Sequence, residues 1–166
     1  METKIDEAGL FTGLAVLHWS PISIFDKRVD QSFYQALIQK NKGKSLELGC
    51  GAGRLLLTFL KMDLDVEGAD ISAGQLETCR RDGEAAGLSP VLYEQKMQEL
   101  DLPHRYRTIY IPCGSFQCVM GREAAKEALK RCHTHLEPGG VLAFNLAPSH
   151  KYYFEYVDDE PTYPGA

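Results

Sequence analysis

Residues 46–54 read LELGCGAGR, and this stretch decides the fold class. Residues 45–48 predict a short strand, glycines follow at positions 49, 51 and 53, and residues 54–62 have the apolar spacing of a helix. Glycines allow the backbone to approach a ligand closely, and the first turn of a helix offers N–H groups without helical partners. The stretch therefore predicts a turn that binds an anionic or strongly polar ligand.

Outward from this stretch, strands alternate with helices. This alternation predicts βαβ units with right-handed crossovers and a parallel sheet with helices on both faces. Residues 72–75 fit a capping box, in which the Ser72 hydroxyl accepts a backbone N–H and the Gln75 side chain reaches back. Residues 138–140, Pro-Gly-Gly, predict a turn. We expect helices at 26–39, 54–62, 72–86 and 122–135, and strands at 45–48, 66–69, 91–94, 108–111 and 141–146.

The composition restricts the partners. A chain of 166 residues suits one domain, and its net charge of −5 provides no broad positive field for a phosphate backbone. Neither a secretory signal nor an apolar stretch of membrane-spanning length is present in this sequence. The five cysteines form no Cys-x-x-Cys pair, which favours thiols in a reducing compartment. We expect a cytoplasmic protein with no nucleic-acid or membrane partner.

The glycine spacing and the charge beside the loop narrow the range of possible ligands. A dinucleotide fingerprint needs a glycine at position 54, where this chain has Arg54. Glu47 stands just before the loop, and its carboxylate is a poor neighbour for a pyrophosphate. The same carboxylate suits a ligand with a cationic amine and a sulfonium, so the stretch favours S-adenosylmethionine over a dinucleotide.

At this point the sequence resembles a known family, the class I S-adenosylmethionine-dependent methyltransferases. Residues 46–54 resemble its motif I, residues 66–72 (VEGADIS) its second-strand motif, and residues 135–140 (HLEPGG) the turn before its fifth strand. Residues 114–117 (GSFQ) are typical of the bacterial small-molecule branch. The resemblance implies an α/β fold with a Rossmann-like, doubly wound, mostly parallel sheet in the order 3-2-1-4-5. It also implies methyl transfer from S-adenosylmethionine to a small-molecule acceptor.

The resemblance also implies a set of cofactor-binding residues. Asp70 follows Gly49 at a spacing close to that of acids that accept from ribose hydroxyls in related nucleotide folds. Ile71 and Met97 would pack on the adenine, and Gln98 would accept from its amino group. No metal site is expected, and the catalytic residues cannot be identified from the sequence. The predicted cofactor-binding set is Glu47, Gly49, Cys50, Gly51, Gly53, Arg54, Asp70, Ile71, Met97, Gln98 and Cys113.

Several of these residues have a second interpretation. Arg54 either reaches the carboxylate of the ligand or is a solvated arginine at a helix start. Cys50 is a small residue that fits the loop, and Cys113 is more often a packing residue than a nucleophile. His133 and His135 are two positions apart, so they make a poor metal pair on a helix.

Two departures from the family pattern stand out. Lys96 occupies the position where the branch carries an acid for the adenine amino group, and a lysine cannot accept that bond. The closing hairpin of the family has no counterpart, since only residues 147–166 follow the fifth strand. We expect a domain at 1–150, with a helical cover at about 1–43, and a tail at 151–166. The bare edge at 141–146 predicts a homodimer, or a tail strand folded back on it.

Two other functions stay open. One is a module that binds the cofactor without turnover, suggested by Lys96 and the short C-terminal part. The other is a nicotinamide-dependent dehydrogenase, which Arg54 and Glu47 disfavour. The methyl acceptor is not readable, because methyl transfer needs an in-line approach more than a recognisable acid–base pair.

Overall fold

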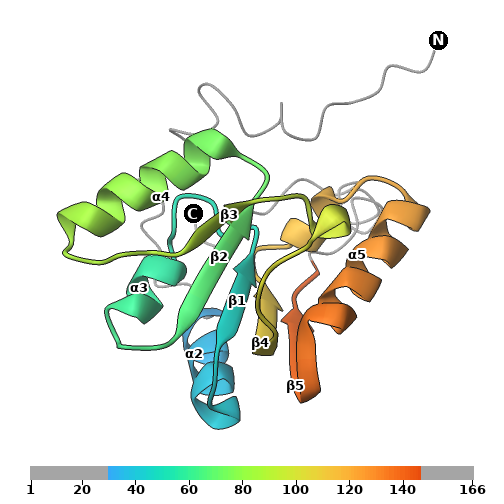
Figure 1. Ribbon diagram of the computed structural model, residues 1–166, viewed down its shortest axis with the longest axis horizontal. Helices are drawn as coiled ribbons and strands as arrows, with labels where there is room; N and C mark the ends of the chain where they lie inside the picture. The colour runs from blue at the N-terminus through green and yellow to red at the C-terminus, as the bar shows by residue number, and fades with distance from the viewer. Residues whose placement is uncertain (1–29, 147–166) are drawn as a thin grey trace, which may run out of the picture.

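A five-stranded parallel sheet forms the middle of the protein in the computed structural model, which describes residues 30–146 (Figure 1). The strand order is β3-β2-β1-β4-β5, so the predicted α/β class and the predicted order are both confirmed. The strands are β1 (Ser45–Leu48), β2 (Val66–Asp70), β3 (Leu92–Glu94), β4 (Tyr106–Ile111) and β5 (Leu136–Phe144).

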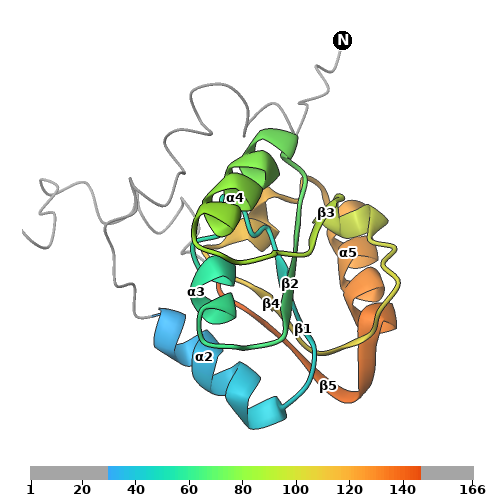
Figure 2. The same ribbon diagram turned by 60° about the vertical axis from the view of Figure 1, so that its left-hand side comes forward.

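Helices cover both faces of this sheet. Figure 2 shows α2, α3 and α4 on one face and α5 with the short helix η2 on the other. Each layer has its own apolar core, one around Phe59 and Leu56, the other around Leu46 and Ile109. The helices are α2 (Asp30–Asn41), α3 (Leu56–Leu60), α4 (Ala73–Ala85), η2 (Met97–Glu99), η3 (Ser115–Cys118) and α5 (Arg122–His135).

Strand β1 is the centre of the sheet, and all four of its residues are buried. It pairs with β2 on one side and with β4 on the other, so Ser45 lies opposite both Val66 and Thr108. The strand order reverses direction here. In open parallel sheets this reversal leaves a crevice at the carboxyl ends of the strands, and the glycine loop begins at that end of β1.

The start of β5 differs from the sequence prediction. Residues 138–140 are not a turn before a strand at 141–146, because β5 already begins at Leu136. Tyr106 pairs with Leu136 and Thr108 with Val141, so β5 bulges between these two pairs. Arg107 holds the bulge by donating from Nη1 to the Pro138 carbonyl oxygen at 2.9 Å. The expected turn was therefore wrong: these residues form a bulge within the strand.

The other boundaries shift by a few residues. Helix α3 begins at Leu56 rather than at Arg54, because the Gly53 N–H closes a turn on the Cys50 carbonyl oxygen at 2.9 Å. Strand β5 lies at the edge of the sheet, as expected. The tail that we expected to cover it, the domain boundary at 150 and most of the cover at 1–43 lie outside the described residues. Within residues 30–146, no helix is both long and apolar enough to cross a bilayer.

Candidate functional site

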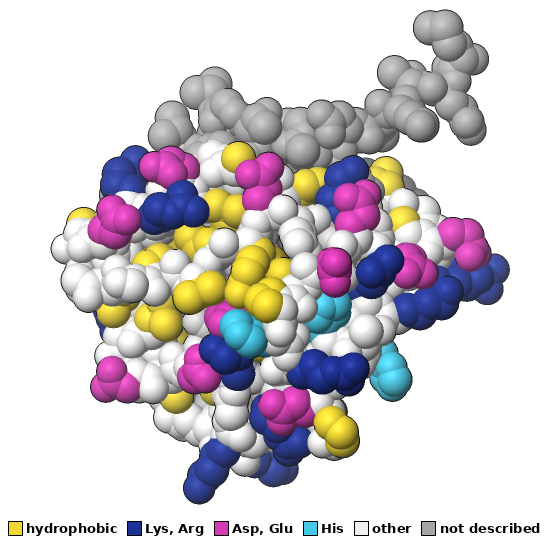
Figure 3. Space-filling model, in the orientation of Figure 1, with side chains coloured by type: hydrophobic (Ala, Val, Ile, Leu, Met, Phe, Trp, Pro, Cys, Tyr) yellow, Lys and Arg dark blue, Asp and Glu magenta, His cyan; other side chains and the backbone are white. Residues whose placement is uncertain are grey.

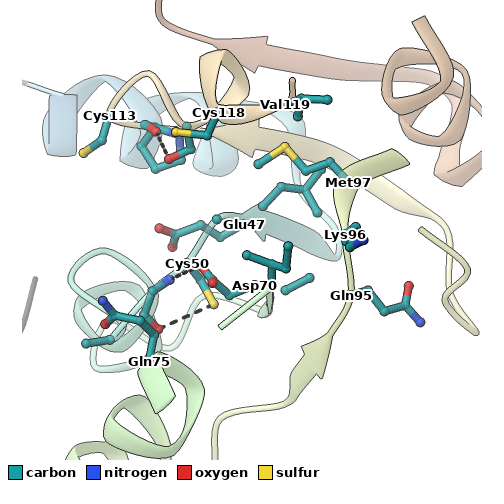
Figure 4. Close-up of a pocket in the computed structure, with 18 of the residues that line it drawn as sticks. Glu47, Cys50, Asp70, Gln75, Gln95, Lys96, Met97, Cys113, Cys118 and Val119 are labelled. Atoms are coloured by element: carbon teal, nitrogen blue, oxygen red, sulfur yellow. Dashed lines mark hydrogen bonds between the residues drawn. The ribbon is translucent and has the colours of Figure 1, made fainter. Parts of the chain in front are cut away.

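A pocket opens at the carboxyl ends of β1, β2 and β4, at the crevice where the strand order reverses. Figure 4 shows Cys50, Asp70 and Gln75 on one side of it and Cys113, Cys118 and Val119 on the other. The lining comes from residues 47–52 and 54 around the glycine loop, 69–71 and 75 after β2, 95–98 after β3, and 112, 113, 115, 118 and 119 after β4.

Gly51 exposes backbone to this pocket. Its φ is +53°, in the left-handed region that favours glycine. A Cβ built on Gly51 would have one protein atom within 4 Å, Oε1 of Gln75 at 3.8 Å. By contrast, a Cβ on Gly49 would lie 2.9 Å from Cβ of Ser115. The open side of the loop is therefore at Gly51, where a side chain would fill space that a ligand can use.

Gly53, a member of the predicted cofactor-binding set, does not line the pocket, and its contact with the cofactor stays a prediction. A Cβ on Gly53 would lie 2.5 Å from Sγ of Cys79 and 2.8 Å from Cγ of Leu57. Gly53 therefore allows helices α3 and α4 to pack closely against the loop. The spacing of three glycines does not distinguish a packing glycine from a ligand-facing one.

Asp70, at the end of β2, fixes the glycine loop. Its Oδ2 accepts from the Gly51 N–H at 2.8 Å, and its Oδ1 accepts from the Ser72 N–H at 2.8 Å. Burial raises the pKa of this carboxyl, although the backbone N–H bonds oppose the shift. Each carboxylate oxygen can accept more than one bond, and Asp70 lines the pocket. Its predicted contact with ribose hydroxyls stays a prediction.

The capping box at the start of α4 is half formed. The Ser72 hydroxyl accepts from the Gln75 N–H at 3.3 Å, as expected. The Ser72 N–H, however, is taken by Asp70 rather than by the Gln75 side chain. Gln75 instead lies at the pocket with 2% of its surface exposed, and its Oε1 makes no hydrogen bond to any described residue. Sequence reasoning assigned Gln75 to the cap and missed it as a site residue.

Glu47 places a second carboxylate on the pocket wall. It is 2% exposed, and the Tyr110 hydroxyl donates to its Oε2 at 3.0 Å. Burial raises the pKa of Glu47 to about 8, because a single hydroxyl bond does not compensate for the lost water. A cation in the pocket would favour the charged form of this group.

Arg54 is ion-paired, so the solvated interpretation of this residue is wrong. Its Nη1 and Nη2 donate to the two carboxylate oxygens of Asp30, at 3.1 and 2.6 Å, and its side chain is 15% exposed. Its Nη2 also lies 3.1 Å from Sγ of Cys113, a residue with φ of +59°. Arg54 and Cys113 both line the pocket, and the pair with Asp30 joins helix α2 to its rim.

The remaining predicted residues also reach the pocket. Cys50, Ile71, Met97 and Gln98 line it, and Figure 4 shows the Met97 side chain extending toward its centre. Lys96 lines it as well, with 42% of its side chain exposed and its Nζ 3.7 Å from Oε1 of Glu99. Ser115, Cys118 and Val119 complete the wall after β4. None of them is in the predicted cofactor-binding set, although Ser115 belongs to the GSFQ segment that carries the family resemblance.

The described residues contain no group of three or more His, Cys, Asp or Glu side chains arranged to hold a metal ion. His135 instead joins two segments. Its Nε2 accepts from the Leu102 N–H at 2.9 Å, and its Nδ1 donates to the Arg131 carbonyl oxygen at 2.8 Å. Both ring nitrogens of this histidine are therefore hydrogen-bonded within the α5 layer.

Comparison with known proteins identifies the family. A family model described as a methyltransferase domain matches residues 46–140, more than half of the chain. The chain belongs to this methyltransferase-domain family. The matched span includes the glycine loop, Asp70 and the segment after β3, which together form most of the pocket wall.

Individual relatives agree on the fold and differ in length. A provisionally named methyltransferase of Geobacillus sp. (strain WCH70) is 24% identical over 138 residues, which are 76% of this chain and 56% of that protein. A solved S-adenosylmethionine-dependent methyltransferase from Clostridium acetobutylicum is similar with a TM-score of 0.68 and 20% identity, covering 80% of this chain and 55% of the other. The glycopeptide N-methyltransferase MtfA, solved with S-adenosylmethionine, gives 0.59 and 25%, covering 69% and 52%. The chain thus spans about half the length of these proteins.

Proposed function

We propose that this chain binds S-adenosylmethionine in the pocket beside Gly51 and takes part in methyl transfer to a small-molecule acceptor. The observation that carries the proposal is the combination at one crevice of an open glycine backbone, the buried carboxylate of Glu47 and the half-buried carboxylate of Asp70. The family of the chain and the S-adenosylmethionine held by MtfA support the choice of cofactor.

The residues of the pocket fit the chemical groups of this cofactor. Glu47 has a buried carboxylate that forms no ion pair with a described residue, and the charge of nearby Arg54 offsets its desolvation only in part, so it suits a positively charged sulfonium or amine. Asp70 retains acceptor capacity for hydroxyls of a ribose. Ile71 and Met97 offer apolar surface for a purine ring. Arg54 would hold the carboxylate of the ligand while remaining beside Asp30.

The cofactor, when bound, supplies a methyl group on a sulfonium, and the products are the methylated acceptor and S-adenosylhomocysteine. The work of the protein is then to orient the two molecules and to exclude water. Asp70 keeps the loop in place through the Gly51 N–H. Across the pocket, Cys118 and Val119 offer an apolar wall on which an acceptor can pack (Figure 4). No proton-transfer residue is assigned.

A small acceptor is favoured over a nucleic acid by the charge distribution. The net charge is −5, and Figure 3 shows acidic and basic side chains interspersed over the face in view. A nucleic-acid backbone is held by concentrated positive charge. The glycopeptide substrate named for MtfA is in keeping with a small acceptor.

Isothermal titration calorimetry tests the proposal directly. We expect S-adenosylmethionine and S-adenosylhomocysteine to bind, and NADH to give no heat beyond dilution. Binding of NADH alone would instead support a dehydrogenase. Mass spectrometry of a panel of amine, hydroxyl and carbon acceptors, incubated with the chain and S-adenosylmethionine, then separates an enzyme from a module without turnover. If neither sulfur compound binds, the proposal fails.

A further inference from the structure

We propose that Gln75 is a further cofactor-binding residue, whose side-chain carbonyl oxygen accepts a hydrogen bond from a ribose hydroxyl beside Asp70. This inference rests on the proposed function and adds a specificity contact to the same pocket. It concerns a residue that the sequence alone assigned to a helix cap.

The first observation is an unsatisfied buried atom. Gln75 is 2% exposed, and its Oε1 accepts no hydrogen bond from any described residue. Among the buried side-chain nitrogen and oxygen atoms of residues 30–146, it is the one that has no hydrogen-bond partner. Buried polar atoms in folded proteins nearly always have a partner, because leaving one without costs about 1–3 kcal/mol. An oxygen left in this state on a pocket wall is suited to a ligand that donates.

The second observation is the position of this oxygen. Apart from Gly51 and its two chain neighbours, Oε1 of Gln75 is the described protein atom nearest to the open side of Gly51, 3.8 Å from where a Cβ would stand. The N–H of Gly51 is held by Oδ2 of Asp70 at 2.8 Å. The acceptor atoms of Gln75 and Asp70 therefore lie next to the same loop residue. Figure 4 shows both residues on one side of the pocket.

The chemistry of the two acceptors selects the donor. An amide oxygen carries no net charge, so it provides less stabilisation to a cation than a carboxylate does. The buried carboxylate of Glu47 is available for a cationic group. A neutral diol presents two hydroxyl donors side by side, and Asp70 with Gln75 presents two neighbouring acceptors. The ribose of the cofactor has this arrangement of donors.

Gln75 is not needed for the helix cap. The cap bond runs from the backbone N–H of Gln75 to the Ser72 hydroxyl, and the Ser72 N–H is bound to Asp70. Replacing the Gln75 side chain leaves both bonds in place. Because the substitution removes an unsatisfied buried atom, Gln75→Met should leave the melting temperature of the ligand-free chain unchanged or higher.

The test compares S-adenosylhomocysteine with its 2′-deoxy and 3′-deoxy analogues by calorimetry. The wild type should prefer the diol over each analogue. Gln75→Met should bind S-adenosylhomocysteine about tenfold more weakly, the size of one hydrogen bond to a buried acceptor, and should lose its preference over one analogue. Gln75→Glu keeps an acceptor at this position and should retain that preference.

Gln39→Met is the matched control, because Gln39 is exposed on helix α2 and does not line the pocket. It should keep the wild-type preference among the three ligands. The inference is overturned if Gln75→Met binds S-adenosylhomocysteine within twofold of the wild type and discriminates equally well. A wild type that binds none of the three overturns the proposed function instead.

Discussion

Glu47 and Glu67 are the same residue type on neighbouring strands, both are nearly inaccessible to solvent, and their surroundings differ. They are 2% and 3% exposed, and they occupy successive positions of the β1–β2 register, with Glu47 opposite Gly68 and Glu67 opposite Leu46. Tyr110, the partner of Glu47, belongs to the core on the α2–α4 face. Tyr106, a partner of Glu67, belongs to the core on the α5 face.

Glu67 is surrounded by donors. Burial raises the pKa of its carboxyl, but hydrogen bonds, the largest of them from Lys44, outweigh burial and hold the pKa below its usual range. Glu47 has one such donor, Tyr110, and its pKa rises to about 8. The donors to Glu67 are Lys44 Nζ at 2.9 Å, Tyr106 OH at 2.8 Å, Tyr93 OH at 3.2 Å and His104 Nδ1 at 3.2 Å.

The difference in hydrogen-bond donors distinguishes a carboxylate that stabilises the fold from one that is available to a ligand. Glu67 has its charge compensated by the protein and belongs to the fold. Glu47 keeps a desolvated acid on a pocket wall with little compensation, and such incomplete compensation is typical of functional sites. The following predictions change one side of this comparison at a time.

The largest expected effect is the loss of stability in Glu67→Gln. The substitution removes the charge that Lys44 and Tyr106 donate to and turns an amide NH2 toward these donors, which should cost about 3 kcal/mol of unfolding free energy, although Lys44 keeps its pair with Asp65. Urea denaturation followed by circular dichroism measures this. Glu47→Gln is the matched control and should cost less than about 1 kcal/mol, since the amide still accepts from Tyr110. Equal losses in the two variants would contradict the comparison.

The next effect is on cofactor binding by Asp70. Asp70→Ala should weaken binding of S-adenosylhomocysteine by roughly 1–3 kcal/mol, the range for hydrogen bonds to a charged group. Part of this loss comes from the freed Gly51 N–H. Calorimetry measures the affinity, and the urea midpoint of the ligand-free variant separates loop loosening from the lost ligand contact. Unchanged affinity would remove Asp70 from the site.

A smaller effect follows from the pKa of Glu47. A cationic ligand prefers the charged carboxylate, so affinity for S-adenosylmethionine should rise up to about tenfold as the pH increases from 6.5 toward 8, and then level off. Calorimetry across this range, corrected for buffer ionisation, measures the slope. In Glu47→Gln the slope should disappear.

The raised pKa of Glu47 also predicts how the free energy of unfolding changes with pH. A carboxyl whose pKa is raised in the folded state destabilises the fold as the pH rises from its ordinary value of 4.5 toward about 8. The unfolding free energy of Glu47→Gln, relative to that of the wild type, should therefore be higher at pH 8 than at pH 5. If the wild type and the variant lose the same stability between pH 5 and pH 8, the raised pKa of Glu47 is contradicted.

The smallest expected effect is that of Lys96→Asp, because Lys96 is half exposed and lies near Glu99. If this position faces the adenine amino group, an acceptor there should tighten S-adenosylhomocysteine binding by less than about 1 kcal/mol. Calorimetry decides it, with Glu99→Gln as a control for the altered charge. Weaker binding would show that the segment after β3 is aligned incorrectly.

The parts of the molecule that were predictable are those encoded in local sequence. The glycine loop, the alternation of strands with helices and the strand order all follow from residues within short windows or from the family pattern. Most of the predicted site residues reach the pocket for the same reason. Residues at the carboxyl ends of neighbouring parallel strands meet at one crevice.

The parts that were missed depend on contacts between distant segments. The donors to Glu67 come from three separate segments of the chain, around residues 44, 93 and 104–106, and no sequence pattern relates these segments. The packing role of Gly53 was missed because its partner, Cys79, lies in another helix. Gln75 was assigned to the cap because sequence does not show that Asp70 already binds the Ser72 N–H.

The central place of β1 also has a kinetic consequence. Its pairing with β2 joins nearby segments, whereas its pairing with β4 brings Ser45 to Thr108 and requires closure of a long loop, which we expect to be the slower event. One wall of the pocket, with Asp70, belongs to the first pairing, and the opposite wall, with Val119, arrives only with the second. A ligand that touches both walls therefore binds after the slow step. It should lengthen the lifetime of the folded chain and leave the folding rate unchanged.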